Sequence, residues 1–361
     1  MPPTLGKTST RDTGATRQLA MLLLLAALLA GGCARSDPDA PFDNYLSRLA
    51  RTLGVAASPP PMPGFPRPPR SGGLRLAIPA GKLHALDFLG LHGCDLQVTV
   101  GKRNSSLGRL APASQLLLLE LEFLRLAPAC IAQLDAEGRE DLAATLAGAA
   151  DDKRNQLPAL IFNATLGGDE YRAFWQQARA PGTYPASGGA TSAAALLAIN
   201  AMAERWLGGD YRADGTEFEL LLGEVAGGGG GVLLQAMLRQ QAWLAAANDV
   251  IDTRIERGPL CATGIRHRAA DILPNVVRKF FIGELQPQAA ALDRSRYQLL
   301  PAVATLESRL APVLPEAYRQ WLQTRNRLID SAIRAPREHV EALKRIEAPC
   351  GESETIAPRG G

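Results

Sequence analysis

The chain has 361 residues, 46% of them hydrophobic and only 5% aromatic, with a formal net charge of +3. The first 32 residues hold three bases and one acid, so the remainder carries a charge near +1. A balance this close to neutral argues against a nucleic-acid-binding protein and against a polybasic membrane surface. The remaining length is that of one large or two small domains, ample for a hydrophobic core.

The amino terminus has the pattern of a secretory signal. A 12-residue apolar run, Leu19–Ala30, follows three bases and ends in small residues, whereas a bilayer span needs roughly 20 apolar residues. Residues 30–33, Ala-Gly-Gly-Cys, resemble a bacterial lipobox, with alanine where leucine is usual. The resemblance implies removal of residues 1–32 as a lipoprotein signal peptide, two acyl chains on the sulfur of Cys33 and one on its amine. The alternative is an ordinary signal peptide in which Cys33 is incidental.

Residues 33–41 then form a short lipid-anchored tether. Several acyl chains on one cysteine hold a protein at a membrane far more firmly than one chain does. Ala34 follows the anchor at the position where an aspartate would favour retention in the inner membrane. We therefore expect a protein anchored in the inner leaflet of the outer membrane and facing the periplasm, with that membrane as its first partner.

The other four cysteines, Cys94, Cys130, Cys261 and Cys350, form an even set in an oxidising compartment, which predicts disulfides. Three connectivities are possible. We favour Cys94–Cys130 with Cys261–Cys350, because each bridge closes within one half of the chain. No C-x-x-C motif occurs and the four histidines are scattered, so the sequence predicts neither a metal site nor a cofactor.

After the tether we expect a unit of a short helix and a proline-rich connector, residues 42–73. Apolar residues at helical spacing predict a helix over 42–54, with Gly54 at its end. Residues 58–73 contain seven prolines, which favour an extended connector packed over the body. The alternative is a ligand for a proline-reading module.

Residues 74–351 form the predicted helical domain, followed by a disordered tail, 352–361. Helical periodicity or capping residues mark five segments: 114–130, 191–209, 216–219, 231–257 and 318–333. Pro128 is predicted to end the first of these helices, Thr191 to cap the second and Thr216 to cap the third.

One segment is ambiguous between strand and helix. Residues 95–101 alternate apolar and polar side chains as a strand does, and residues 74–78 would be a partner for them. The predicted fold class is therefore all-α, a multi-helix domain stapled by disulfides, with at most a minor β accessory.

No motif for catalysis stands out. Ser187 lacks the first glycine of the G-x-S-x-G turn of serine hydrolases. Glycines 227–231 precede Val232 rather than the Lys-Ser of a phosphate loop, which indicates an interhelical loop. Glu120 and Glu122, two apart on a helix, face different ways. We therefore name no catalytic residue.

Two polar stretches remain as candidate sites. Arg103, Asn104 and Ser105 offer donors for an anionic or sugar ligand, and the alternative is a helix end whose Asn or Ser caps the next turn. Residues 275–288 combine an aromatic pair with charged side chains, and the alternative there is an amphipathic helix ended by Pro287. The charged run 151–155 is interpreted as a solvated helix face or end.

These segments resemble a family of uncharacterised proteobacterial lipoproteins of the outer envelope, a domain of unknown function. Its members share a lipobox, an early Y-x-x-R-L helix, an R-N-S-S-L-G segment, a late N-V to Q-P segment and a closing P-C-G. In this chain the last four are residues 45–49, 103–108, 275–287 and 349–351. The resemblance implies helical structure across 84–109, which favours a helix for 95–101. It implies no activity.

Three functions are compatible with these features. We expect a non-enzymatic binding or scaffold lipoprotein of the envelope, with an envelope protein as a partner and no nucleic acid. The second hypothesis is a periplasmic hydrolase acting on envelope glycan or peptide, and the third is a carrier of a lipid or another apolar ligand. A pocket that gathers Arg103, Asn104 and an acid would favour a small ligand or an enzyme, and a flat apolar patch a protein partner.

Overall fold

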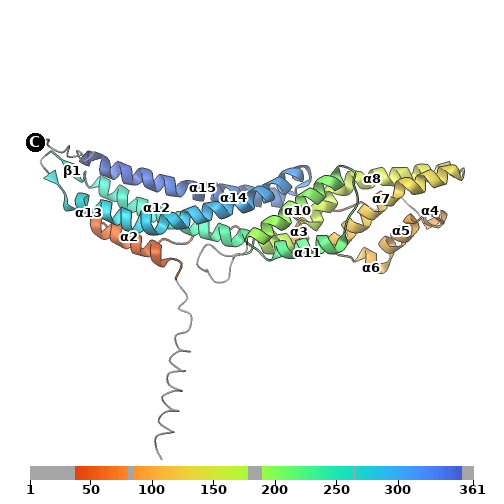
Figure 1. Ribbon diagram of the computed structural model, residues 1–361, viewed down its shortest axis with the longest axis horizontal. Coiled ribbons are helices and arrows are strands. Elements are labelled where there is room, and N and C mark those ends of the chain that lie inside the picture. The colour runs from red at the N-terminus through yellow and green to blue at the C-terminus, as the bar shows by residue number, and fades with distance from the viewer. Residues whose placement is uncertain (1–36, 80–84, 178–188, 264, 352–361) are drawn as a thin grey trace, which may run out of the picture.

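The computed structural model describes residues 37–79, 85–177, 189–263 and 265–351. Its helices run mostly along one long axis, so the molecule is a rod (Figure 1). The regular structure of the described residues is helical apart from two antiparallel strands, β1 (Cys261–Ala262) and β2 (Ile265–Arg266). The predicted all-α fold with a minor β accessory is confirmed, although the strands lie far from the segments considered for them.

Helices of very different length make up the rod. Among the described residues, the six longest are α7 (Ala113–Ala136), α8 (Glu140–Ala164), α10 (Gly189–Leu207), α12 (Gly230–Glu256), α14 (Gln286–Arg309) and α15 (Glu316–Glu347). The shorter ones are α2 (Ala40–Leu53), α3 (Ser71–Leu74), α4 (Ala85–Gly90), α5 (Leu96–Asn104), α6 (Ser106–Arg109), α9 (Asp169–Phe174), α11 (Gly215–Ala226) and α13 (Arg268–Val276). A π-helical segment, η1 (Val277–Leu285), joins α13 to α14, and two 3-10 turns, η2 (Ala311–Val313) and η3 (Ala348–Cys350), flank α15.

Two hydrophobic clusters follow one another along the rod. In one half, α2, α13 and η1 pack with α12 and α15 around Phe42, Trp243 and Phe281. In the other half, the α7–α8 hairpin packs with α10 and α11 around Phe162 and Trp206. Helices α12 and α15 contribute side chains to both clusters, and they therefore join the two halves.

The disulfides lie near the two ends of the rod. Cys94–Cys130 joins the turn before α5 to α7, with 5.5 Å between the Cα atoms, and Cys261–Cys350 joins β1 to η3, with 4.9 Å. The favoured connectivity is confirmed. Helices α4, α5 and α6 lie beside α7 at one end, and β1 and the carboxyl-terminal end of α15 lie at the other (Figure 1). At each end of the rod, a disulfide therefore holds short elements that have few neighbours to pack against.

Several helix ends follow the local sequence, and others do not. Helix α2 ends at Leu53, and Gly54 takes the left-handed φ of 66° that favours glycine. Helix α11 is capped by Asp214, whose carboxylate accepts from the amides of Thr216 and Glu217, so the prediction of Thr216 as the cap is wrong. Aspartate is at least as good a cap as threonine, and it stands two residues earlier.

Two prolines predicted to end helices lie inside continuous helical runs. Pro128 is an exposed residue of α7, which continues to Ala136. Pro287 lies in the first turn of α14, after the π-helical segment in which the amide of Gln286 donates to the carbonyl of Phe281. Proline removes one amide donor, and neighbouring packing or a widened turn compensates for that local loss. Residues 95–101 are helical, within α5, as the resemblance implied.

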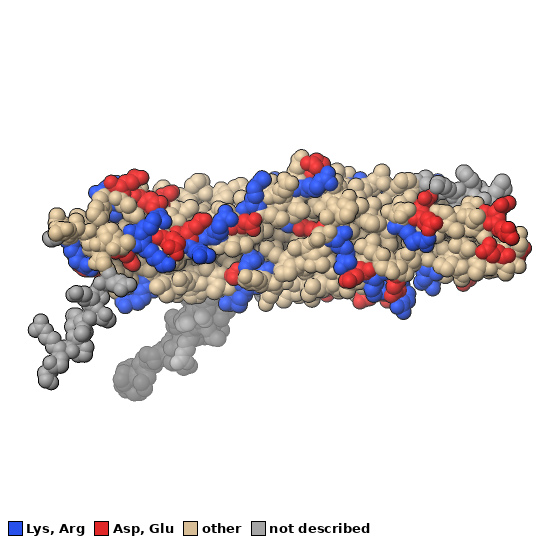
Figure 2. All heavy atoms as spheres, turned by 90° about the horizontal axis from the view of Figure 1, so that it is seen from above, with Lys and Arg blue, Asp and Glu red and all other residues tan. Residues whose placement is uncertain are grey.

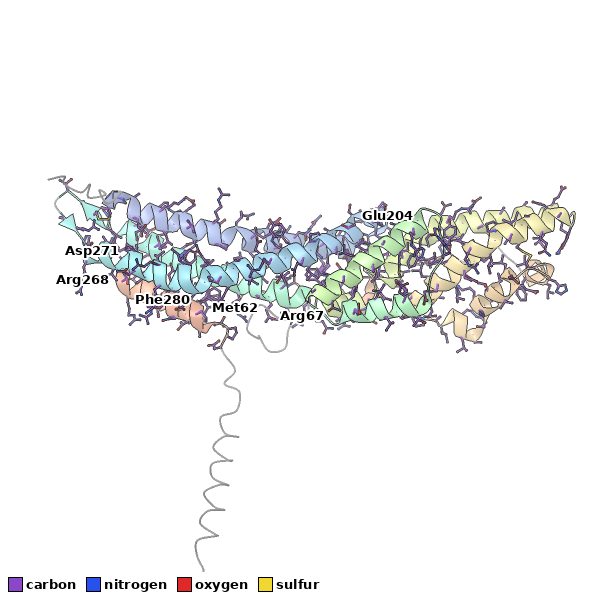
Figure 3. The ribbon with its side chains drawn as sticks, in the orientation of Figure 1. Met62, Arg67, Glu204, Arg268, Asp271 and Phe280 are labelled. Carbon is purple, nitrogen blue, oxygen red and sulfur yellow. A yellow bond between two sulfur atoms is a disulfide. The ribbon has the colours of Figure 1, made fainter. Side chains whose placement is uncertain are left out.

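The proline-rich connector is extended and packs over the body, as predicted. The Trp321 indole donates to the carbonyl of Pro66 at 3.0 Å. Asn163 of α8 binds both backbone groups of Leu76, at 2.8 and 2.9 Å. The connector passes from α2 toward the far half of the rod, and Met62 and Arg67 lie at its lower edge (Figure 3).

One helical run in the described part of the chain, Gly215–Glu256, is long and apolar enough to cross a membrane by length and composition. Two helices, α11 and α12, make up this run, separated by Gly227–Gly229. The side chains of α12 are central to both hydrophobic clusters, which is the behaviour of a core helix in a folded domain.

Candidate ligand-binding cleft

A cleft lies at the end of the rod that carries the Cys94–Cys130 disulfide, between α5 and α6 on one side and α7 and α8 on the other. Its main cavity measures about 340 Å³. An adjoining cavity of about 470 Å³ shares Ile78, Arg103 and Arg109 with it and extends toward Arg75. We call both cavities together the distal cleft. The main cavity is lined by Ile78, Pro79, Thr99, Val100, Arg103, Asn104, Arg109, Leu119, Glu120, Phe123, Ala149, Lys153 and Gln156.

The walls of the distal cleft are fixed by close packing. Helix α6 folds back on the last turn of α5, and Gly108 permits this because a Cβ there would lie 2.1 Å from the Lys102 carbonyl. The disulfide from Cys94 to Cys130 holds the start of α5 against α7. The extended segment that ends the connector forms the third wall, held by Asn163 through Leu76. The cleft is therefore preformed by elements distant in sequence.

A clamped carboxylate lies in the wall of the cleft. Glu120 of α7 is only 4% exposed. Its Oε1 accepts from Arg103 Nε at 2.9 Å, and its Oε2 accepts from the Lys153 ammonium of α8. The Lys153 ammonium also lies over the Phe123 ring, 4.7 Å from its centre. Two cations thus share one buried anion, so this group of charges is positive overall.

Two further cations line the distal cleft and have no carboxylate partner among the described residues. Arg75 and Arg109 are exposed, and neither forms a salt bridge with any described residue. Glu120 is the only acid in the described lining of either cavity. Beside these charges lie the apolar side chains of Ile78 and Phe123. The cleft therefore offers guanidinium donors next to an apolar wall, which suits a ligand with a carboxylate or phosphate and an apolar part.

The structure separates the three predicted site residues. Arg103 lines the cleft and bonds to Glu120, while Asn104 lies exposed at its rim. Ser105 is the cap of α6, where its Oγ accepts from the Gly108 amide at 3.0 Å and donates to the Lys102 carbonyl at 2.8 Å. Ser105 is therefore a helix cap, as the alternative prediction has it. Arg103 and Asn104 remain candidates for binding a ligand.

Sequence reasoning missed Glu120, Phe123 and Lys153. The run 151–155 was interpreted as a solvated face, yet the Lys153 side chain is only 15% exposed and faces α7. The signal was present in the spacing, because Glu120 and Phe123 stand three apart on α7 and thus share a face. One acid on an otherwise apolar helix face indicates a buried partner.

The other sequence candidates do not assemble into a site. Ser187 lies outside the described residues. Gly230 and Gly231 begin α12, and a Cβ on Gly231 would lie 1.9 Å from the Gln176 carbonyl, so that glycine is required by close packing. Within the described ranges, no three His, Cys, Asp or Glu side chains gather closely enough to hold a metal ion.

A family model described as a protein of unknown function, DUF3080, matches residues 42–353. The chain belongs to this family. The DUF3080 match begins at Phe42 in α2 and includes both disulfides and the whole distal cleft. No curated protein and no solved structure matches the chain.

Proposed function

We propose that this DUF3080 protein is a lipid-anchored binding protein of the cell envelope that faces the periplasm. Its ligand carries a carboxylate or phosphate next to an apolar part and occupies the distal cleft. The observation that carries the proposal is the combination, in one preformed cleft, of Arg109 and Arg103 with the apolar side chains of Ile78 and Phe123.

The lipid anchor is supported by the amino-terminal sequence. A short apolar leader ends in Ala-Gly-Gly-Cys, and Cys33 is separated from α2 by only a few residues. The two disulfides agree with an oxidising compartment such as the periplasm. Ala34 in place of aspartate favours the inner leaflet of the outer membrane.

Binding suits the cleft better than hydrolysis does. A hydrolase of glycan or peptide needs an acid and a base, or an activated nucleophile, that can exchange protons with a substrate. In the described lining of the cleft the one carboxylate, Glu120, is already bonded to Arg103 and Lys153. The described lining therefore offers no second acid or base with which Glu120 could form a catalytic pair.

The binding site is tested with the fluorescent probe 8-anilinonaphthalene-1-sulfonate, which combines an anionic group with an apolar ring system. We expect saturable binding that weakens about tenfold in Arg109→Ala, because a charge-assisted hydrogen bond is lost. Arg51→Ala, an exposed arginine of α2 outside the cleft, is the matched control and should bind as the wild type does. The uncharged probe N-phenyl-1-naphthylamine should not distinguish the variants. Equal affinity of Arg109→Ala and wild type for the sulfonate contradicts the cleft as the site.

The anchor is tested separately by growing cells with an alkyne-labelled palmitate. We expect the wild-type chain to incorporate the label and Cys33→Ala to incorporate none. A control replacement of Ser36 by alanine, three residues later, should leave labelling intact. Labelling of Cys33→Ala to the wild-type level would remove the lipid anchor from the proposal and leave the cleft untouched.

A further inference from the structure

The near-neutral net charge hides an uneven distribution along the chain. Residues 44–119 hold nine lysines and arginines against two aspartates, a net charge of +7 in a chain whose total is +3. The rest of the chain is therefore acidic overall. The described part of this basic stretch is most of α2, the connector, helices α3 to α6 and the first turns of α7. A near-neutral total charge therefore does not exclude a basic surface on one part of the molecule.

Helix α6 and the residue that follows it expose two leucines within this basic stretch. Leu107 of α6 is 85% exposed, and Leu110, directly after the helix, is 86% exposed. They stand only three residues apart in the chain. Lys102 and Arg109 flank them, and no acid occurs between residues 96 and 119. Single exposed leucines are common on folded proteins, but an adjacent pair almost wholly in solvent beside unopposed bases is not.

The pair is held firmly in place. Ser105 caps α6, and Gly108 seats the helix on the last turn of α5. The Cys94–Cys130 disulfide in turn fixes the turn before α5 to α7. The backbone that carries Leu107 and Leu110 is therefore held by local contacts that keep both side chains in solvent. Burial of these two side chains in the core would stabilise the fold more.

The basic stretch reaches the lower edge of the rod at helix α6 (Figure 1) and, in the connector, at Met62 and Arg67 (Figure 3). Helix α11 lies along the same edge and exposes Glu217, Glu219 and Glu224, so the edge as a whole has mixed charge and α6 marks its basic end. Arg67, Arg70 and Lys102 are exposed and form no salt bridge with any described residue. On the upper side, bases and acids are interspersed (Figure 2). On α15, for example, Lys344 pairs with Glu341.

We propose that the α6 end of the rod contacts a membrane rich in anionic lipid, and that Leu107 and Leu110 insert into its interface. Apolar side chains flanked by bases are the recognised composition of interfacial segments, and the bases match anionic head groups. Helix α6 is then a point of contact with the membrane that is separate from the amino terminus. Lipidation of Cys33 is not required, although it would raise the local concentration of α6 at the surface.

The test uses residues 34–361, which contain every described residue, with vesicles of phosphatidylcholine alone or mixed with phosphatidylglycerol. We expect sedimentation with the anionic vesicles, weakened by salt and weakened about fivefold in Lys102→Ala. Leu107→Ser with Leu110→Ser should weaken binding about tenfold or more. Leu197→Ser is the matched control: Leu197 is 58% exposed on α10, seven residues before Glu204 at the upper edge (Figure 3).

The full-length chain provides a second measurement. A photo-reactive amino acid at position 107 should crosslink to phospholipid in cell envelopes, and the same residue at position 197 should not. Equal binding to both kinds of vesicle, or wild-type binding by the double leucine variant, overturns the proposal. A change of oligomeric state in that variant without a change in vesicle binding assigns the leucines to a second copy instead. The cleft proposal is unaffected by any of these outcomes, because its test uses Arg109 and a soluble probe.

Discussion

Two carboxylates of this molecule are buried to nearly the same degree, and each is bonded to at least one cation, yet their surroundings differ. Glu307 is 5% exposed and Glu120 is 4% exposed. Glu307 accepts two bonds from Arg325, at 2.7 and 2.8 Å, and is also the acceptor for two tyrosine hydroxyls. Glu120 is held by Arg103 and Lys153 in the wall of a cleft.

The cluster around Glu307 is closed to solvent. The guanidinium of Arg325 lies over the rings of Trp175 and Trp321, at 4.6 and 5.0 Å, and its side chain is 4% exposed. Burial raises the pKa of Tyr171 and of Tyr318, and the nearby charge of Glu307 raises both further. Both hydroxyls therefore stay protonated and donate to Glu307.

The cluster around Glu120 is open on one side. The Arg103 side chain is 32% exposed, and Lys153 is 15% exposed, so both cations retain donors that reach the cleft. Burial of the anion is thus the same in a structural cluster and in a candidate binding site. The two differ in the exposure of the cations around the anion, because only exposed donors can exchange water for a ligand.

The sharpest test of the closed cluster is Arg325→Met. It leaves Glu307 buried without its guanidinium, and we expect the free energy of unfolding to fall by about 3–5 kcal/mol. Urea denaturation followed by circular dichroism measures the change. The double variant Glu307→Leu with Arg325→Met should recover much of the loss, because neither charge is then left unpaired. A single variant as stable as the wild type would show that the cluster contributes little.

A second closed polar group, in the other half of the rod, gives a prediction about pH. His339 is fully buried, and the Tyr45 hydroxyl donates to its Nε2 at 2.6 Å. The other ring nitrogen, Nδ1, donates to the Asn248 carbonyl oxygen at 2.7 Å. Burial lowers the pKa of His339 from 6.5 to about 4. The folded protein therefore keeps this imidazole neutral at pH values where the unfolded chain would already protonate it.

The sign of the effect follows from proton uptake. Between pH 6.5 and about 4 the unfolded chain binds a proton that folded His339 does not, so acid favours unfolding. The contribution of neutral His339 to the free energy of unfolding is fully present above pH 6.5. It falls by on the order of 3 kcal/mol as the pH drops to 4. Denaturation across this range should show that slope in the wild type, and His339→Gln should lack it. An unchanged slope in His339→Gln would assign the acid sensitivity to other groups.

The fold was more predictable than the site, for physical reasons. The helix at 42–54 and its end at Gly54 follow from periodicity and one left-handed residue, which are local properties. The disulfides follow from cysteine number and spacing. Pro128 and Pro287 were misjudged, because a proline inside a helix costs only a local hydrogen bond, which the surrounding packing outweighs.

The distal cleft was predictable only in part. Arg103 and Asn104 were identified from their donors and their position between apolar stretches, and both line the cleft. Their partners Glu120 and Lys153 come from two other helices, brought near Arg103 by packing and by the Cys94–Cys130 bridge. The apolar face around Glu120 indicates that this acid has a buried partner, but contacts between distant elements leave no short-range pattern, so the sequence does not show that the partners are Arg103 and Lys153.

The smallest predicted effect on stability is the one that separates the two carboxylates most clearly. Glu120→Gln removes a buried anion whose two partners reach the cleft, so water can solvate them, and unfolding should become easier by only about 1 kcal/mol. The same change removes the one acid in the described lining of the cleft, so the anilinonaphthalene sulfonate should bind about fivefold more tightly. Glu122→Gln is the matched control, because the Glu122 side chain is 42% exposed and pairs with the exposed Arg125 outside the cleft lining, and it should alter neither quantity. A stability loss as large as that of Arg325→Met would mean that the cleft cations are as closed as those around Glu307, and the distal cleft would then be structural.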